Sequence, residues 1–331
     1  MNLLVIGGTR FLGPHVVKAA LSRDHRVTIF NRGSKLLPDV PGLLQVKGDR
    51  RTGLHALGEA AFDGVVDTCA YYPADVEASA SRLAGRCSRY CLISTASVYA
   101  ADSGDLDEDA ALVDLPATIP ETVTAETYGA LKVLCERAAK QSFENQLLIV
   151  RPGLIVGPDD ATHRFGYWVR RIARGGDLVV PDPPDAPVEF IDVRDLAKWL
   201  VLALERDLAG TYNVNGPGKR TTMSEFLAAC VATVGTNARL HWVPTKQLLA
   251  SGVEPWVELP MWIPPGPNGF LTFDSAKARR DGLTFRPLEA TIAAARAWDS
   301  EHGPSETTMR TLTEAKEAAI LAGLGVARDA G

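Results

Sequence analysis

The sequence predicts an α/β protein with a doubly wound parallel sheet and a smaller C-terminal α/β lobe. Three observations support this prediction. Short apolar runs alternate with helical patterns through the first half of the chain, a glycine-rich turn follows the first apolar run, and prolines and glycines accumulate after residue 152. Alternating strands and helices form right-handed crossovers, and these make a parallel sheet that helices cover on both faces.

The expected elements follow from apolar alternation and helical periodicity. We expect strands at 2–6, 26–30, 43–46, 64–67, 90–93 and 147–150, and helices at 11–23, 74–84 and 126–141. Beyond them we expect a helix at 193–205, a strand at 211–214, a helix at 223–234 and a last helix at 306–321. The sheet domain is expected to span 1–157, with 186–215 returning to it. The substrate lobe and the C-terminal helices are expected at 158–185 and 216–331.

The composition argues against several classes of protein. Lys and Arg are scattered and the net charge is −5, which disfavours a nucleic-acid-binding face. No apolar run approaches the roughly eighteen residues that span a membrane, and the first run is too short for a signal peptide. We therefore expect a cytoplasmic protein. The five cysteines and six histidines lack metal-ligand spacing, so we expect reduced thiols and no metal site.

The glycine-rich turn predicts a dinucleotide site. Gly7 and Gly8 end the first expected strand, and a helix is expected to begin after Arg10 and before Gly13. A turn between a strand and a helix start offers backbone N–H groups and the positive end of a helix dipole to a pyrophosphate. Glycines permit the tight turn and the close approach of the phosphates.

The end of the second strand favours NADP(H) over NAD(H). An acid that binds the adenine ribose hydroxyls is expected near residue 31, but the chain has Asn31 followed by Arg32. Neither repels a 2′-phosphate, and Arg32 or Arg10 can pair with one. Arg32 can equally be a solvated loop charge. Asp49 can bond the adenine amine or cap the next helix, and both remain open.

A tyrosine and a lysine lie one helical turn apart in the expected helix 126–141. Tyr128 and Lys132 share one face of that helix because they stand at i and i+4. Such a pair is weak evidence by itself. A strand that ends in Ser94-Thr95-Ala96-Ser97 precedes it. The carboxyl ends of parallel strands face the ligand crevice, so these hydroxyls are placed to reach a substrate.

Several segments occur in the order typical of one known superfamily. They are the glycine turn, the hydroxyl cluster at 94–97, the Tyr128–Lys132 pair, the run 151–158 (RPGLIVGP), the run 190–197 (FIDVRDLA) and the run 212–214 (YNV). Together they resemble the short-chain dehydrogenase/reductase superfamily, and within it the extended branch, the NAD-dependent epimerase/dehydratase family. The resemblance covers nearly the whole chain and implies a Rossmann-like fold. The GGTRFLG turn is similar to that of an atypical subgroup that includes reductases and the chloroplast stem-loop-binding proteins.

The resemblance implies a role for each motif. Tyr128 is the expected general acid–base, and Lys132 is expected to lower its pKa towards neutrality and to hold the nicotinamide ribose. Thr95 is expected to hydrogen-bond the reacting oxygen, with Ser94 as its substitute. The expected cofactor contacts are Gly7, Thr9, Arg10, Phe11, Leu12, Gly13, Asn31, Arg32, Asp49, Arg50, Cys69, Ala70, Tyr128, Lys132, Pro152 and Gly153. The expected substrate contacts are Tyr71, Thr95, Ser97, Trp168 and Trp256.

The sequence departs from the family pattern in two respects. Arg10 replaces the middle glycine of the turn; it can cover a phosphate or weaken cofactor binding. The two arginines that clamp a diphosphate in nucleotide-sugar enzymes of this family are missing: Val188 and Glu189 precede Phe190 at the first position, and the second falls in 264–267 (PPGP). Arg170, Arg171 and Arg174 can substitute for them or be solvated charges.

These observations favour an oxidoreductase that moves hydride between nicotinamide and a secondary alcohol or ketone of a small, non-nucleotide substrate. The first alternative is a sugar epimerase or dehydratase with tightly bound NAD(P), although Ala96 and Ser97 lack the acid pair of the dehydratases. The second alternative is an RNA-binding relative without catalysis. The resemblance also implies a homodimer through the helix that bears Tyr128.

Overall fold

The structure is a computed structural model that describes residues 1–101, 104–266, 269–303 and 310–326. A seven-stranded parallel sheet forms the centre of one of its two units. The chain forms two compact units. Unit 1 comprises Met1–Ile155, Val193–Asn215 and Phe273–Thr284, and unit 2 comprises Val156–Asp192, Gly216–Thr272 and Phe285–Gly331. Each unit is described by itself.

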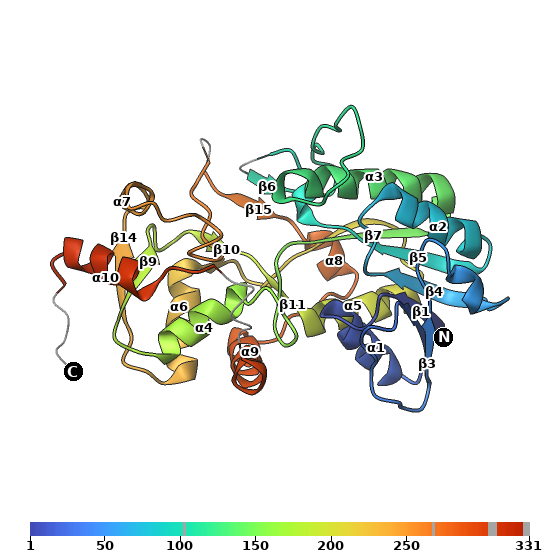
Figure 1. The fold of residues 1–331 in the computed structure, drawn as a ribbon, viewed down its shortest axis with the longest axis horizontal. Helices are drawn as coiled ribbons and strands as arrows, with labels where there is room; N and C mark the ends of the chain where they lie inside the picture. Colours follow the sequence, from blue (N-terminus) through green and yellow to red (C-terminus); the bar gives the residue numbers. More distant parts are fainter. Residues whose placement is uncertain (102–103, 267–268, 304–309, 327–331) are drawn as a thin grey trace. The chain divides into compact units, whose positions relative to one another are not determined.

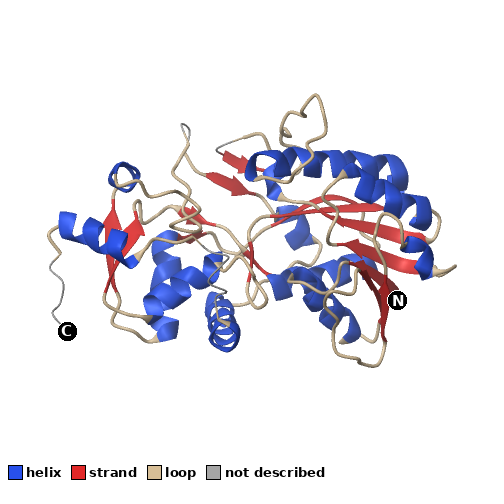
Figure 2. Ribbon diagram, in the orientation of Figure 1, coloured by secondary structure: helices blue, strands red, loops and turns tan. Residues whose placement is uncertain are grey.

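The sheet of unit 1 has the strand order β12-β7-β5-β4-β1-β2-β3. Figure 2 shows the strands in red. Its strands are β1 (Asn2–Ile6), β2 (Arg26–Asn31), β3 (Leu43–Lys47), β4 (Phe62–Asp67), β5 (Cys87–Ile93), β7 (Leu147–Pro152) and β12 (Gly210–Val214). The four residues 3–6 are all fully buried, as a central strand requires when both faces of the sheet are covered. The predicted doubly wound α/β fold is confirmed.

Helices cover both faces of this sheet (Figure 1). On one face α2 (Pro73–Leu83) packs against α3 (Ala125–Phe143), and on the other α1 (Leu12–Leu21) packs against α5 (Val193–Glu205). The short elements are η1 (Leu54–Leu57), η2 (Ala96–Val98), η3 (Glu144–Gln146), β6 (Gly104–Leu106) and α8 (Ala276–Arg280). The hydrophobic core under α2 and α3 includes the stacked rings of Tyr90 and Phe143.

Unit 2 is built on three helices and small sheets. The helices α4 (Arg164–Ala173), α6 (Met223–Val234) and α9 (Leu288–His302) pack on one another around three phenylalanine rings, and α10 (Glu314–Gly323) packs against β9. Strand β9 (Asp177–Pro181) pairs with β14 (Arg239–Val243), and β10 (Pro187–Val188) pairs with β13 (Thr221–Thr222). The helix α7 (Thr245–Ala250) also belongs to unit 2. The chain passes from one unit to the other at three short strands, β8 (Ile155–Val156), β11 (Ile191–Asp192) and β15 (Leu271–Phe273).

The unit boundaries differ from those expected at three places, the smallest of which is residues 156–157, which belong to unit 2. Residues 273–284 belong to unit 1, because Lys277 donates a hydrogen bond to the Thr211 carbonyl at 2.7 Å and Asp274 N–H donates to Leu106 at 2.8 Å. Residues 186–192 belong to unit 2, where Phe190 N–H donates to the Gly216 carbonyl at 2.9 Å. Residues 306–309 of the expected last helix, and Pro267, lie outside the described residues.

In the described part of the chain no helix is long and apolar enough to cross a membrane. The described ranges also hold no group of three or more His, Cys, Asp or Glu arranged to bind a metal ion. The five cysteines are free thiols.

Candidate active site

The glycine turn after β1 packs so tightly that only glycine fits at two positions. Gly7 has φ +100°, and a Cβ there would lie 2.3 Å from Thr68 Oγ1. A Cβ on Gly13 would lie 2.4 Å from the Gly8 Cα. Helix α1 then begins without a side-chain cap at Phe11 and without an acid in its first turn. The backbone N–H groups and the helix dipole at this end suit a phosphate.

The residues expected at the adenine end lie at the ends of β2 and β3. Asn31 Oδ1 accepts a hydrogen bond from Gly33 N–H at 2.6 Å, and its buried Nδ2 has no hydrogen-bond partner. An orphaned buried amide fits a ribose oxygen. Arg32 is exposed. Asp49 Oδ1 accepts from Arg51 N–H at 2.9 Å, which favours the interpretation that Asp49 caps its own turn.

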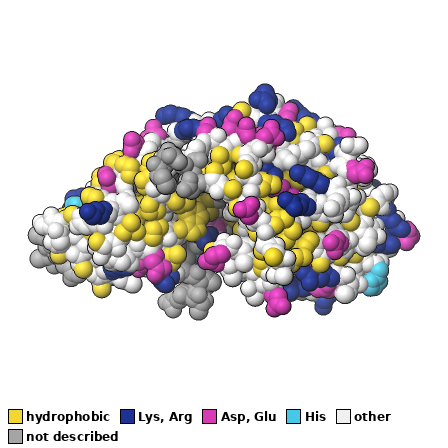
Figure 3. All heavy atoms as spheres, turned by 90° about the horizontal axis from the view of Figure 1, so that it is seen from above, with side chains coloured by type: hydrophobic (Ala, Val, Ile, Leu, Met, Phe, Trp, Pro, Cys, Tyr) yellow, Lys and Arg dark blue, Asp and Glu magenta, His cyan; other side chains and the backbone are white. Residues whose placement is uncertain are grey.

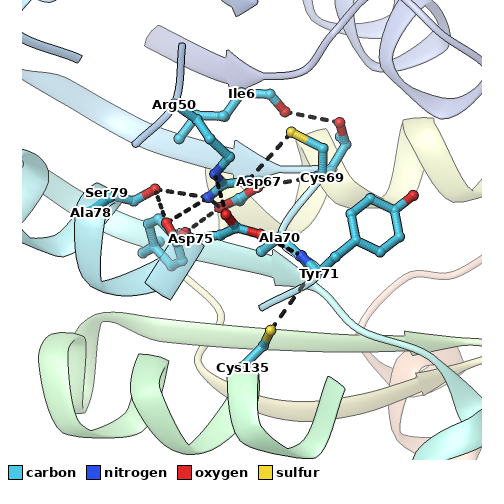
Figure 4. A network of polar contacts seen from close by, with 12 residues as sticks. Ile6, Arg50, Asp67, Cys69, Ala70, Tyr71, Asp75, Ala78, Ser79 and Cys135 are labelled. Atoms are coloured by element: carbon cyan, nitrogen blue, oxygen red, sulfur yellow. Dashed lines mark hydrogen bonds and ion pairs between the residues drawn. The ribbon is translucent and has the colours of Figure 1, made fainter. Parts of the chain in front are cut away.

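Arg50 lies in a network of buried polar side chains (Figure 4). Its terminal nitrogens donate to both carboxylate oxygens of Asp67 at 2.9 and 2.6 Å and to Ser79 Oγ at 3.0 Å. Burial opposes the charge of Asp67, but the attraction of Arg50 outweighs it, so the pKa of Asp67 is lowered. Arg50 therefore serves as the counterion of the fully buried Asp67, and its expected contact with the cofactor stays a prediction.

Thr95 and Tyr128 are brought together by a close approach of helix α3 to the turn η2. Thr95 caps this turn, since its Oγ1 accepts a hydrogen bond from Ser97 N–H at 3.1 Å. A Cβ on Gly129 would lie 2.2 Å from the Ser97 carbonyl oxygen, so glycine is required where the helix meets the turn. The hydroxyl of the neighbouring Tyr128 lies near that of Thr95, which acts to lower the Tyr128 pKa. The two hydroxyls therefore share one small site.

Lys132 does not lower the pKa of Tyr128, contrary to the expectation from the sequence. Burial, followed by the repulsion of Tyr71, raises the pKa of Tyr128 to about 12, and Lys132 does not contribute to this shift. The Lys132 ammonium is buried and donates to the carbonyls of Ala70 and Ile93, each at 2.7 Å. The expected lowering of the Tyr128 pKa is therefore wrong for the protein alone, because the ammonium points at the ends of β4 and β5.

Pro152 and Gly153 follow the same pattern of close packing at a strand end. Pro152 ends β7, and Gly153 N–H donates to Asn215 Oδ1 at 2.8 Å. A Cβ on Gly153 would lie 2.2 Å from that oxygen. Cys69 lies beside the glycine turn, where its Sγ would be 3.3 Å from a Cβ on Gly7. These contacts place the ends of β1 and β4 side by side, and likewise the ends of β7 and β12.

Sequence reasoning missed a buried ion pair one turn beyond Lys132. Glu136 accepts hydrogen bonds from Arg151 at 3.0 and 2.7 Å, and both side chains are 2% exposed. Ser94 Oγ donates to the same carboxylate, so Ser94 is not free to replace Thr95. The available sequence signal was a charged residue on the apolar side of a helix and another at the end of a buried strand.

The residues expected to contact substrate divide between the units. In unit 1, Tyr71 is 45% exposed and its ring centroid lies 6.5 Å from that of Tyr128, and Ser97 is exposed nearby. In unit 2, Trp168 is fully buried and donates its indole hydrogen bond to the Pro260 carbonyl at 2.7 Å. The expectation for Trp168 is corrected, because its ring belongs to the core of unit 2. Trp256 is partly exposed.

The arginines of α4 that were candidates for a phosphate clamp have acidic partners within unit 2. Arg170 pairs with Asp299, Arg171 with Glu317 and Arg174 with Glu314. The Arg171 pair is buried. These pairs favour a structural role over diphosphate binding.

Comparisons with known proteins place this arrangement among relatives. The sequence profile of the NAD-dependent epimerase/dehydratase family matches residues 3–215. The chloroplast stem-loop binding protein of 41 kDa b from Arabidopsis thaliana is 26% identical over 250 residues, which cover 71% of this chain but only 63% of that protein. A UDP-glucose 4-epimerase from Neisseria meningitidis is 24% identical, with 81% of this chain and 99% of that one covered.

Solved structures confirm the fold. The Bordetella bronchiseptica enzyme WbmH in complex with NAD⁺ aligns with a TM-score of 0.65 at 20% identity, covering 91% of this chain and 99% of that one. The UDP-glucuronic acid 4-epimerase from Bacillus cereus in complex with NAD aligns with a TM-score of 0.65 at 18% identity and the same coverage.

Proposed function

Because the chain belongs to the NAD-dependent epimerase/dehydratase family, and its motifs predicted an NAD(P)-dependent enzyme, we propose the following reaction. The enzyme transfers hydride between a nicotinamide cofactor and a secondary alcohol or ketone of a small substrate. The observation that carries this proposal is the contact of Gly129 with Ser97, since it sets the Tyr128 hydroxyl against Thr95 at a strand end.

The two hydroxyls divide the work at the substrate oxygen. Tyr128 holds its proton firmly, because burial raises its pKa to about 12, so it is poised to donate that proton to a carbonyl oxygen. Thr95 hydrogen-bonds the same oxygen. The bound cofactor supplies the hydride. Lys132, anchored on the Ala70 and Ile93 carbonyls, lies on the same helical face and is placed to hold the nicotinamide ribose.

The cofactor residues favour NADP(H). The uncapped start of α1 takes the pyrophosphate, and the unpartnered Asn31 amide takes a ribose oxygen. Arg32 and Arg10 are exposed cations that follow β2 and β1, and either can pair with a 2′-phosphate. Thr9, Leu12, Cys69, Ala70, Pro152 and Gly153 remain proposed backbone or packing contacts, and Asp49 a proposed adenine contact.

The substrate that we propose is not a nucleotide sugar. The family's first clamp arginine is replaced by buried Val188 and by Glu189, and the α4 arginines pair with acids. Tyr71 offers a half-exposed ring beside Tyr128, which suits an apolar group next to the reacting carbon.

Epimerisation of a sugar remains the second candidate, because a relative that covers most of this chain is a UDP-glucose 4-epimerase. The same tyrosine serves both reactions. An epimerase reoxidises its cofactor within each turnover and therefore retains it, whereas a reductase releases it. RNA binding, as in the name of the chloroplast relative, is disfavoured by the net charge of −5 and by the mixed charges on the face drawn in Figure 3.

Two measurements test the proposal. The purified protein is denatured and the released dinucleotide is identified by mass: an empty protein that prefers NADPH supports the reductase, and stoichiometric bound dinucleotide supports the epimerase. Steady-state turnover with carbonyl substrates is then compared between wild type, Tyr128→Phe and the control Tyr72→Phe. Full activity of Tyr128→Phe would refute the mechanism. Light scattering of the purified protein tests the proposed homodimer through α3.

A further inference from the structure

Unit 2 contains an arginine whose charge has no counterion. Arg164 begins α4 and is partly buried, and burial lowers the pKa of its guanidinium. Its guanidinium carbon lies 5.2 Å from the centroid of the Trp256 ring, an interaction that stabilises a cation but leaves its N–H donors unused. Within the described ranges, Arg164 forms no hydrogen bond and no ion pair.

The acids around Arg164 do not form an ion pair with it. Asp160 attracts Arg164; its Oδ1 accepts from Thr162 N–H and Oγ1 at 2.8 and 2.7 Å, and its buried Oδ2 has no hydrogen-bond partner. Burial raises the pKa of Asp160, which further weakens it as a counterion. In the loop that carries Trp256, Glu258 pairs with Lys316 and Glu254 with Arg310.

A second donor without a partner lies in the loop that carries Trp256. Trp262 is 3% exposed, and its indole N–H is buried without a hydrogen-bond partner. Its backbone carbonyl accepts from Trp256 N–H at 3.0 Å, so the two tryptophans are neighbours. Trp256 also has φ +63°, a strained value for a bulky residue, and such strain concentrates at binding sites.

We propose that Arg164, Trp256 and Trp262 form an oxyanion-binding site in unit 2. Two unsatisfied donors, one of them cationic and partly desolvated, match a carboxylate or a phosphate monoester, which accepts in-plane hydrogen bonds from a guanidinium. That this ligand is the substrate rests on the proposed function. If it is, the substrate of that reaction carries an anionic group. The site itself does not depend on that function.

The test uses the full chain labelled with ¹⁵N-tryptophan, which gives one indole signal for each of its six tryptophans. Trp256→Phe and Trp262→Phe assign two of these signals. The protein is titrated with benzoate, with inorganic phosphate and with uncharged benzamide. We expect benzoate or phosphate to shift the Trp262 and Trp256 signals, and benzamide to leave both in place. Benzoate alone would identify a carboxylate site, and phosphate alone a phosphate site.

The variants decide which residue binds. Arg164→Gln is expected to weaken binding of the anion about tenfold or more, because the variant loses one charge-assisted hydrogen bond. Arg174→Gln removes an exposed arginine from the same helix and is expected to change nothing. Equal affinity in Arg164→Gln and wild type, or anion shifts confined to other tryptophans, would overturn the proposal. In Tyr128→Phe the anion titration is expected to stay normal, so a failure of the proposed reaction is distinguishable from a failure of this site.

Discussion

Gly129 of α3 lies against the carbonyl oxygen of Ser97, and a Cβ at Gly129 would sit 2.2 Å from that oxygen. The contact joins the helix that carries Tyr128 and Lys132 to the turn capped by Thr95. The geometry of the proposed acid–base pair thus depends on the absence of one side chain.

Gly129→Ala is expected to push α3 away from the turn. Overpacking of this kind costs about 1–3 kcal/mol of stability, and a displacement near 1 Å lowers turnover about a hundredfold. Thermal unfolding and steady-state kinetics measure the two effects. The control is Gly323→Ala, where a Cβ meets nothing within 4 Å. A Gly129→Ala enzyme with wild-type turnover would show that the close contact does not position Tyr128.

The Tyr128 phenol is expected to titrate late. Its folded pKa of about 12 lies above the ordinary value of 10.0 because burial disfavours the phenolate. The neutral phenol therefore stabilises the fold fully below pH 10, and this contribution is lost as the pH rises from 10 to 12. The ultraviolet difference spectrum of wild type against Tyr128→Phe should show this late phenolate. Phenolate formation at neutral pH in the protein without cofactor would contradict the prediction.

Arg32→Ala is expected to weaken NADPH binding about tenfold or more and to leave NADH binding unchanged. The reason is that a charge-assisted hydrogen bond to a 2′-phosphate contributes about 1.5–3 kcal/mol, and only NADPH has that phosphate. Fluorescence titration with each nucleotide measures both affinities. Lys35→Ala, an exposed cation in the same loop, is the control. Equal losses for both nucleotides would remove the assigned preference.

Glu136→Leu is expected to destabilise the protein by about 3–5 kcal/mol, because it leaves the buried Arg151 without a counterion. The double variant Glu136→Leu/Arg151→Met is expected to recover most of that loss, since neither charge then remains. Denaturant unfolding of the singles and the double measures this. The exposed pair Arg174–Glu314 provides the control, with an effect of about 0–1 kcal/mol for Arg174→Gln. Additive effects of the two core substitutions would refute the pairing.

The parts of the fold that depend on local pattern were predictable. Apolar runs gave the strands of the central sheet, and the i, i+4 spacing put Tyr128 and Lys132 on one face of α3. The partners of buried charges were not predictable. Arg50 reads like any cation near a nucleotide, and only the fold shows that Asp67 lies within its reach.

Aromatic residues posed the same difficulty. Trp168 and Trp256 have the same chemistry and both fall in the lobe, yet one is sealed in the core and the other lies beside Arg164. Trp168 lies on α4 and its indole reaches the Pro260 carbonyl, whereas Trp256 lies in a loop. Contacts between residues so far apart in the sequence are not visible in its local pattern. The crossing of residues 273–284 into unit 1 was missed for the same reason.

The division of unit 1 into three chain segments bears on how the protein is made. Strand β12 pairs with β7, and α5 packs against α1, yet both arrive only after residue 192. While the chain emerges from the ribosome, its first 155 residues expose the unpaired edge of β7 and the apolar face of α1 until β12 and α5 have been synthesised. A fragment cut at the apparent end of the nucleotide-binding half would keep that edge permanently, and would aggregate where the whole chain folds.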